Sequence, residues 1–261
     1  MRLATWNVNS IRARVDRVAA WLQRSDIDVL AVQETKSRDE QFPYDTFKQA
    51  GYEVAHLGTS QWNGVAIASR VGITDVEQGF PGMPAWGEPP LEETRALGAT
   101  CGGVRVWSLY VPNGRSLADP HLQYKLQWLD ALRIAGAGWL AADPDAQVAL
   151  CGDWNIAPRD EDVWDMRVFA TSTHVSPPER AAFRAVVEAG FADVVRPYTP
   201  GEFTYWDYTQ LRFPRREGMR IDFVLGSPAL AARTTEAKID REERKGKGAS
   251  DHAPVVVDLA D

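Results

Sequence analysis

The stretch RLATWNVNSIRARVDRVAAWLQRSDIDVLAVQE, residues 2–34, opens the chain and sets its architecture. Its two ends, 2–8 and 27–34, are rich in apolar and β-branched side chains, as expected for buried strands. Between them four apolar residues recur every three or four positions, as on one face of a helix: Ile11, Val15, Val18 and Leu22. The stretch therefore predicts a strand, a helix and a second strand, the opening unit of an α/β fold.

Strand-like runs continue through most of the chain. Seven further segments are expected as strands: 52–57, 64–70, 95–100, 104–111, 147–153, 219–226 and 253–260. Two stretches, 79–90 and 245–248, are dense in Gly with Pro or Lys and are expected as loops. Two sheets packed face to face, with helices outside, would cover so much strand surface.

Two more segments predict helices. One begins near Pro120 and carries leucines at helical spacing, and the other, 177–190, has Pro near its start and Gly at its end. No repeat or low-complexity linker divides the 261 residues, so we expect one domain, 1–261. A composition of 44% hydrophobic and 25% charged residues is ordinary for a globular protein.

The net charge of −7 argues against indiscriminate coating of nucleic acid, because polyanion binding needs Lys and Arg facing the phosphates. DNA stays open as a substrate, since carboxylates that hold metals can coexist with a basic rim. Cys101 and Cys151 lie in apolar runs without metal-ligand spacing, so both are expected to be buried and reduced. With no leader-like start and no apolar run of about 18 residues, we expect a cytoplasmic protein with no membrane contact, a monomer by default.

Polar residues stand where apolar strand runs end. Five such clusters occur: WNVNS (6–10), QETK (33–36), YVPNG (110–114), GDWNIAP (152–158) and SDHAPV (250–255). Carboxylates and amides are costly to bury unless they are hydrogen-bonded or hold a metal. Their recurrence in one strand-exit context indicates a shared functional site.

Three carboxylates carry the chemistry that the residue types suggest. Glu34 ends an apolar strand and suits Mg²⁺, although a surface Glu in a loop is the simpler reading. Asp153 and Asn155 would face the same way on an extended backbone, as a water-orienting base beside an amide, or they form an Asx turn. Asp222 lies in an apolar strand and needs a partner; His252 is the one we favour, with backbone N–H groups as the alternative.

Other polar residues have two readings each. Asn7 is either part of the site or a turn residue. Asp251 and His252 are adjacent and should diverge, so that one could meet a metal and the other a phosphate. Tyr110 could donate its hydroxyl to a phosphate or pack in the core.

Two loops could contact a nucleic acid. Asn113 and Arg115 lie in a turn, and Arg115 is either a phosphate contact or a solvated charge. The segment FTYWDY at 203–208, with Tyr205 and Trp206, could form a platform for a base or sugar, or an aromatic mini-core.

In this order, WNVNSIR, QETK, GVAI, YVPNG, GDWN, RIDF and SDHAPV resemble the motifs of the exonuclease III and AP endonuclease family, over residues 2–258. The resemblance implies the DNase I-like fold, a four-layer α/β sandwich of two mixed β-sheets flanked by helices. It also implies a Mg²⁺-dependent hydrolase, with Mn²⁺ as an alternative ion. Its substrate would be double-stranded DNA, cut 5′ to abasic sites or trimmed of nucleotides and blocking groups at 3′ ends, leaving a 3′-hydroxyl and a 5′-phosphate.

The resemblance also implies metal ligands. Glu34 resembles the principal Mg²⁺ ligand, with Asn7 and Asp251 close to the metal. Asp153 resembles the residue that positions or deprotonates the attacking water. Asn155 resembles the amide that holds the scissile phosphate, and both belong to a second metal position.

The remaining matches concern the phosphate and the DNA. Tyr110 resembles the phosphate-contacting tyrosine, and Asp222 with His252 the hydrogen-bonded pair at the phosphate, with His252 also near the metal. Tyr205 and Trp206 resemble the wall of the abasic-sugar pocket. Met219 stands where some members carry Trp, and its flexible thioether chain can line a small apolar pocket.

Two rival functions keep the same fold. One is a phosphoesterase that acts on a small or lipid phosphoester, which the acidic net charge would suit. The other is a catalytically silent DNA-binding module. Five intact polar residues argue against silence: Glu34, Asp153, Asn155, Asp222 and His252.

Overall fold

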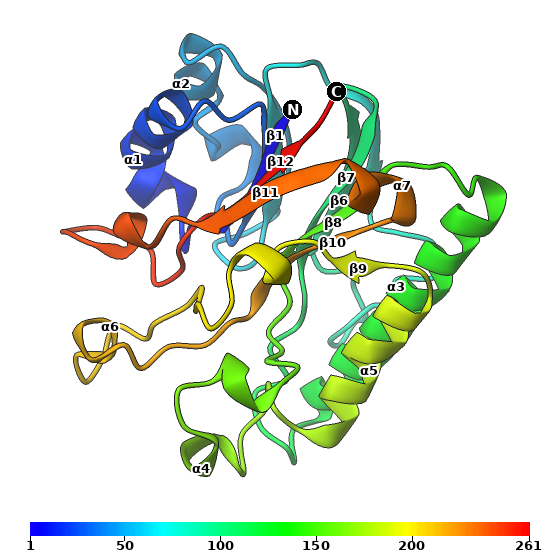
Figure 1. Cartoon of the computed structure of the whole chain (residues 1–261), viewed down its shortest axis with the longest axis vertical. Coiled ribbons are helices and arrows are strands. Elements are labelled where there is room, and N and C mark those ends of the chain that lie inside the picture. The colour runs from blue at the N-terminus through cyan, green and yellow to red at the C-terminus, as the bar shows by residue number, and fades with distance from the viewer.

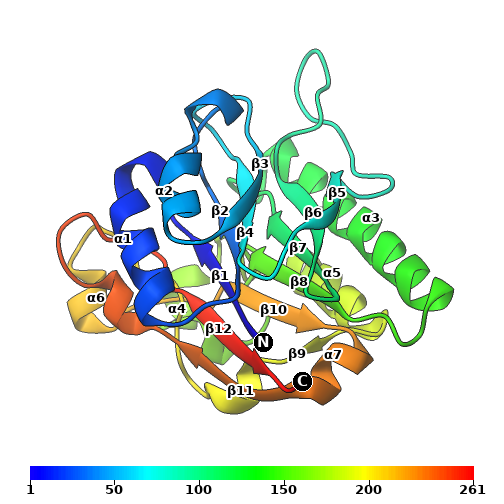
Figure 2. The ribbon, with the colours of Figure 1, turned by 90° about the horizontal axis from the view of Figure 1, so that it is seen from above.

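Two six-stranded sheets pack face to face in a computed structural model that describes all 261 residues (Figures 1 and 2). Helices cover the outer face of each sheet, with α1 and α2 on one side and α3 and α5 on the other in Figure 2. The expected four-layer α/β sandwich is confirmed.

The first sheet has the order β11-β12-β1-β2-β4-β3. Its strands are β1 (Arg2–Asn7), β2 (Val29–Gln33), β3 (Glu53–Leu57), β4 (Val65–Ser69), β11 (Thr234–Ile239) and β12 (Val255–Leu259). Only β1 and β2 run parallel, because the crossover helix between them brings the chain back to the end of the sheet at which β1 began. Both therefore deliver their carboxyl ends side by side.

The second sheet has the order β5-β6-β7-β8-β10-β9. Its strands are β5 (Thr74–Gln78), β6 (Ala96–Cys101), β7 (Val104–Tyr110), β8 (Val148–Asp153), β9 (Ala192–Asp193) and β10 (Asp222–Gly226). Here β7 and β8 are the parallel pair, and β10 runs antiparallel to β8. The end of β8 thus meets the start of β10, with Asp153 opposite Asp222.

Four helices form the outer layers: α1 (Ile11–Arg24), α2 (Tyr44–Gln49), α3 (Pro120–Ala142) and α5 (Pro177–Glu188). The longest, α3, begins where the Asp119 side chain accepts a hydrogen bond from the His121 backbone N–H, with Pro120 at the first helical position. α3 and α5 lie side by side (Figure 1). The short helices are α4 (Met166–Phe169), α6 (Arg212–Arg215) and α7 (Pro228–Arg233).

β2 shows why the strands read as continuous apolar runs. Successive side chains of a strand point to opposite faces. Val29 and Ala31 pack in the core between the sheets. Leu30 and Val32 pack in the core beneath α1 and α2. Because both faces are buried, the apolar and polar residues do not alternate.

The predicted strands and helices are all present, with ends that differ by a few residues. The largest difference is at 219–226, where β10 begins only at Asp222. Both predicted loops are confirmed, and Cys101 and Cys151 are buried and free. None of the helices combines the length and apolar character that crossing a membrane requires.

Seven strands and α-helices were missed: β5, β9, β11, α2, α4, α6 and α7. Every residue of β5 is exposed, and β11 is mostly polar. Both are edge strands, which need no apolar run because one side or face is solvated. Periodicity alone could not find them.

Candidate metal centre and catalytic site

Four strands deliver polar side chains to one end of the sandwich. β1 ends at Asn7 and β2 is followed by Glu34, both from the first sheet. β8 ends at Asp153 and β10 begins at Asp222, both from the second sheet. The site is therefore built across the junction of the two sheets.

Glu34, Asp153 and His252 form the centre of the site, because one ligand atom from each lies within 4.8 Å of the others. The Asn7 Nδ2 atom donates to Glu34 Oε1 and to Asp153 Oδ2, each at 2.9 Å. Asn7 thus ties a carboxylate of one sheet to a carboxylate of the other.

His252 is held by two carboxylates. Its Nδ1 atom lies 2.9 Å from Asp222 Oδ2 and 3.1 Å from Oδ1, which is the pairing expected from the sequence. Its Nε2 atom lies 3.8 Å from Asp153 Oδ2. Burial alone would lower the pKa of His252, but Asp222 and Asp153 raise it to about 10. Because Nδ1 faces Asp222, only Nε2 is turned toward Asp153, and the expected role of His252 at the metal stays a prediction.

The two central carboxylates differ in protonation. Burial raises the pKa of Asp153 to about 7, with His252 opposing and Asp222 and Glu34 adding to the rise. Burial would also raise the pKa of Glu34, but Lys36 and Asn7 lower it below the ordinary value. Lys36 Nζ lies 2.7 Å from Glu34 Oε2. Glu34 is therefore an ionised carboxylate at neutral pH.

The donor set fits a hard cation. Mg²⁺ is commonly bound through one or two carboxylates and water, and Glu34 and Asp153 supply two carboxylates on rigid strand ends. Asn7 presents its Nδ2 atom to them, while its Oδ1 atom accepts from the Asn9 backbone N–H at 3.0 Å. In this arrangement Asn7 orients the two carboxylates, and its expected contact with the ion stays a prediction.

Asp251 diverges from His252, as expected for adjacent residues. Its carboxylate accepts from Asn9 Nδ2 at 3.0 Å and stands outside the group formed by Glu34, Asp153 and His252. Asn9 in turn accepts from Lys36 Nζ at 2.6 Å, and Lys36 contacts Glu34, so Asp251 is linked to the centre through two residues. A direct role at the metal is the part of the expectation that this geometry does not support.

Asn155 corrects one expectation. Its backbone is left-handed, with φ of 50°, so it does not continue the extended strand of Asp153. The Asn155 backbone N–H donates to Asp153 Oδ1 at 2.9 Å, which is the Asx turn that stood as the alternative. Asn9, Glu34 and Lys36 are also left-handed, at φ of 45°, 51° and 48°. Such backbone strain tends to gather at functional sites.

The Asn155 side chain belongs to a second polar cluster. Its Oδ1 atom lies 3.2 Å from Asn113 Nδ2 and 3.2 Å from His174 Nε2. Asn113, Arg115, His174 and Met219 line an adjoining cavity of about 320 Å³. The Arg115 side chain is exposed, and its Nη1 atom lies 4.0 Å from Asp119 Oδ1. We call the side chains of Asn113, Asn155 and His174 the loop cluster.

Tyr110 lies beside two charged side chains, the Glu34 carboxylate and the Arg95 guanidinium. Burial, followed by the charge of Glu34, raises its pKa well above the ordinary value, so its hydroxyl stays protonated. The Arg95 guanidinium stacks over the Tyr110 ring at 4.8 Å. The hydroxyl is thus a fixed donor beside Glu34.

The aromatic segment at 203–208 divides into two roles. The Tyr205 ring lies 4.9 Å from the His252 ring, and Tyr205 and Met219 line a cavity of about 200 Å³. Trp206 is only 2% exposed and packs against Phe213. We therefore revise the expectation that Trp206 contacts DNA, because its ring is buried against Phe213 and Arg241.

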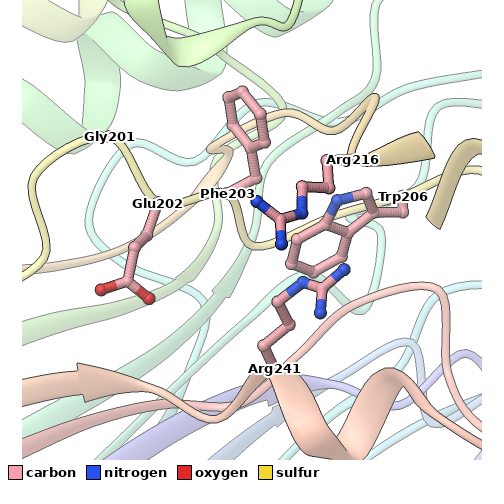
Figure 3. Close-up of a pocket in the computed structure, with 6 residues that line it drawn as sticks. All are labelled: Gly201, Glu202, Phe203, Trp206, Arg216 and Arg241. Atoms are coloured by element: carbon pink, nitrogen blue, oxygen red, sulfur yellow. The ribbon is translucent and has the colours of Figure 1, made fainter. Parts of the chain in front are cut away.

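Behind Trp206 lies a separate pocket of about 270 Å³ (Figure 3). The indole ring lies between Arg216 and Arg241 in this view, with the Arg241 guanidinium 5.5 Å from the ring. Glu202 points away from this group. None of the lining residues belongs to the Glu34, Asp153 and His252 centre.

Sequence reasoning missed four contributors. Asn9 and Lys36 stand inside the quoted motifs but were not singled out. Trp6 is fully buried and donates from Nε1 to the His252 carbonyl at 3.1 Å. His174 was not singled out as a site residue, and only the tertiary structure could place it against Asn155.

Comparisons with known proteins agree with this geometry. The model of the Endonuclease/Exonuclease/phosphatase family matches residues 4–252. An exodeoxyribonuclease from Bacillus subtilis is 30% identical, with 98% of each chain covered. A solved structure of a Neisseria 3′ phosphatase, NExo, bound to a product DNA hairpin, is 35% identical with a TM-score of 0.93, covering 100% of both chains. An AP endonuclease from Archaeoglobus fulgidus is also 35% identical, with a TM-score of 0.91 and 99% of both chains covered.

Proposed function

Because the chain belongs to the Endonuclease/Exonuclease/phosphatase family, we propose that it is a Mg²⁺-dependent DNA repair nuclease of the exonuclease III type. Its substrates would be abasic sites and 3′ ends in double-stranded DNA. The observation that carries the proposal is the group of Glu34, Asp153 and His252, joined by Asn7 across the two sheets.

Each residue has a role in hydrolysis that its contacts support. Glu34 and Asp153 would hold the divalent ion, which when bound neutralises charge that develops on the phosphate oxygens. Asp153 also orients the attacking water and takes its proton. The Asp222–His252 pair presents a positive N–H group to a phosphate oxygen, where it stabilises the transition state.

Two further donors support phosphate binding. The protonated Tyr110 hydroxyl stands beside Glu34, and the Asn155 amide stands one turn beyond Asp153. Both would hold the phosphate in line with the water, and the 3′ oxygen would leave. Mn²⁺ would serve in place of Mg²⁺, because both are hard cations that accept oxygen ligands.

The relatives are named for related reactions on DNA, and the cavities suit both incision at a lesion and trimming at a 3′ end. The exodeoxyribonuclease, the 3′ phosphatase and the AP endonuclease together span incision and 3′ trimming. The cavities lined by Tyr205 and Met219, and by Asn113 and Arg115, could take a base-free sugar or a 3′ terminal nucleotide. We expect a monomer that acts in the cytoplasm.

The decisive experiment is cleavage of an end-labelled duplex that carries one abasic-site analogue, beside an undamaged duplex with a recessed 3′ end. With Mg²⁺, we expect a single cut at the lesion and a ladder from the 3′ end, and EDTA should abolish both. If neither duplex is cut while a small phosphoester is hydrolysed, the DNA substrate is wrong and the metal centre stands.

A further inference from the structure

Lys125 and Glu179 form an ion pair that is wholly removed from water. Lys125 Nζ lies 2.5 Å from Glu179 Oε1, and neither side chain has any exposed area. Lys125 comes from α3 and Glu179 from α5, the two helices that lie side by side in Figure 1. The pair has no place in the hydrolytic mechanism described above.

Burying two charges is expensive, so the retention of this pair needs a reason. An apolar pair of similar volume often gives equal or higher stability than a buried ion pair. Removing one partner alone leaves an uncompensated buried charge and is strongly destabilising. Stability by itself is therefore a weak explanation for two charges at this position.

The pair is hydrogen-bonded to the backbone of three loops. Lys125 Nζ donates to the Asn155 carbonyl at 2.6 Å and reaches the Asn113 carbonyl at 3.5 Å. Glu179 Oε1 accepts from the His174 backbone N–H at 2.9 Å, and Glu179 Oε2 accepts from the Ser176 hydroxyl. An ammonium has three N–H donors, and here each has its own acceptor.

The three residues contacted through their backbones are the same three whose side chains form the loop cluster. Asn113 follows β7, Asn155 follows β8 and His174 precedes α5, so they are far apart in the chain. Their side chains meet at Asn155 Oδ1. The same two charges thus set the position of all three loops.

We propose that Lys125 and Glu179 are positioning residues that hold the loop cluster in the geometry needed to bind the DNA phosphate and sugar. The inference rests on the proposed nuclease function for its kinetic consequence, but not for its structural one. A methyl or thioether group could fill the same space, yet it cannot hold two carbonyls and an amide N–H. The charges are kept for geometry, because only they supply these hydrogen bonds.

The test separates stability from activity. In the variant Lys125→Met/Glu179→Leu no buried charge is left unpaired, but the Asn113 and Asn155 carbonyls and the His174 N–H lose their partners, so we expect a lower melting temperature and compare rates per folded molecule. Its kcat/KM on the recessed duplex should fall by about 10²-fold, as misplacement of binding groups by about 1 Å can cause. The Mg²⁺ concentration for half-maximal rate should stay unchanged, because Glu34 and Asp153 are untouched. A stable variant with wild-type kcat/KM would overturn the proposal.

A second variant and a matched control complete the design. Lys125→Met/Glu179→Gln keeps the size of both side chains and the acceptor for His174, and serves if the apolar variant does not fold. Rates are expressed per folded molecule, and unchanged kcat/KM again overturns the proposal. The control Asp130→Leu/Arg133→Met removes an exposed ion pair from the same helix, in which Arg133 Nε lies 2.8 Å from Asp130 Oδ1. It should change neither the melting temperature nor kcat/KM.

A readout independent of catalysis distinguishes this inference from the proposed function. The side-chain amide NMR signals of Asn113 and Asn155 should shift in the Lys125/Glu179 variants and not in the control. If the wild type fails to cut DNA but these signals shift, the nuclease function fails and the positioning role stands. If the signals do not move, the positioning role is wrong whatever the wild type cleaves.

Discussion

Asp153 is the residue on which most of the site's contacts meet. It accepts from Asn7 and from the Asn155 backbone, and it lies beside His252. The Asp153→Asn variant keeps the size of the side chain and one oxygen for the Asn155 N–H. We expect turnover to fall by about 10²-fold or more, since proton acceptance is lost, while the melting temperature changes little.

The control for this variant is Asp130→Asn, an exposed carboxylate on α3. It should cut the duplex at the wild-type rate. Near wild-type activity in Asp153→Asn, measured under single-turnover conditions, would contradict the assigned role.

His121 gives a pH dependence that is separate from the catalytic centre. Its Nδ1 atom accepts from the Gly114 N–H at 3.3 Å, beside Trp86 and Tyr124. Burial, together with the charges of Arg95 and Arg115, lowers its pKa from 6.5 to about 4. Between these values the unfolded chain takes up a proton that the folded chain refuses. The free energy of unfolding should therefore fall as pH falls from 6.5 toward 4.

Urea unfolding at pH 7, 6 and 5 measures this contribution. The His121→Gln variant should show a shallower loss of stability than the wild type over that range. Some loss should persist, because burial also lowers the pKa of His56 and of His174 to about 4. Identical slopes for the two proteins would exclude His121 as a contributor.

At the scale of elements, the close approach of β7 and β8 depends on Gly152. It has φ of +155°, and a Cβ atom there would lie 1.8 Å from the Leu109 carbonyl oxygen. Gly152→Ala would push the strands apart next to Asp153. We expect a loss of about 1–3 kcal/mol or more in the free energy of unfolding, as for overpacked cores, and reduced activity.

Gly138→Ala is the matched comparison. Gly138 lies inside α3 with nothing within 4 Å of the added Cβ atom. Alanine should there be neutral or stabilise by about 0.5–1 kcal/mol, because it loses less backbone entropy in a helix. Chemical denaturation of both variants checks the contrast, and similar losses would remove the steric explanation.

The elements that the sequence predicted share one property, a buried apolar run. β2 and β8 are buried at every position, so their residue types alone predict that they are buried strands. β5 and β11 lie at sheet edges, where β5 exposes every residue and β11 exposes half of its residues, so they carry no such pattern. Strand identity there is decided by the neighbour that pairs with it.

At the scale of the whole molecule, the site joins the two sheets. Ser108 of β7 donates to the Val32 carbonyl of β2 at 2.8 Å and accepts from Gln33 Nε2 at 3.0 Å. Asn7 makes the same kind of link to Asp153. An ion held by Glu34 and Asp153 would add a further tie, so binding should stabilise the whole fold rather than one loop.

We therefore expect Mg²⁺ to raise the melting temperature of the wild type. At about 100 times its dissociation constant, an ion that binds only the folded state adds about 2.7 kcal/mol. Glu34→Ala should require far more Mg²⁺ for half-maximal cleavage and should lose most of this stabilisation. NaCl at matched ionic strength is the control, and an unchanged Mg²⁺ dependence in Glu34→Ala would remove Glu34 from the metal site.

The sequence by itself determined most of the buried strands and most of the polar residues at the site, because apolar runs and the residues that end them are local properties, and the resemblance of its ordered motifs implied the sandwich. It also predicted the Asp222–His252 pair, since a carboxylate in an apolar strand demands a partner. Only the tertiary structure decided that Asp251 and Trp206 stand back from the centre, and that His174 and the Lys125–Glu179 pair join the Asn155 loop. Those contacts cross between elements distant in the chain, where distance and burial are set by packing and not by local pattern.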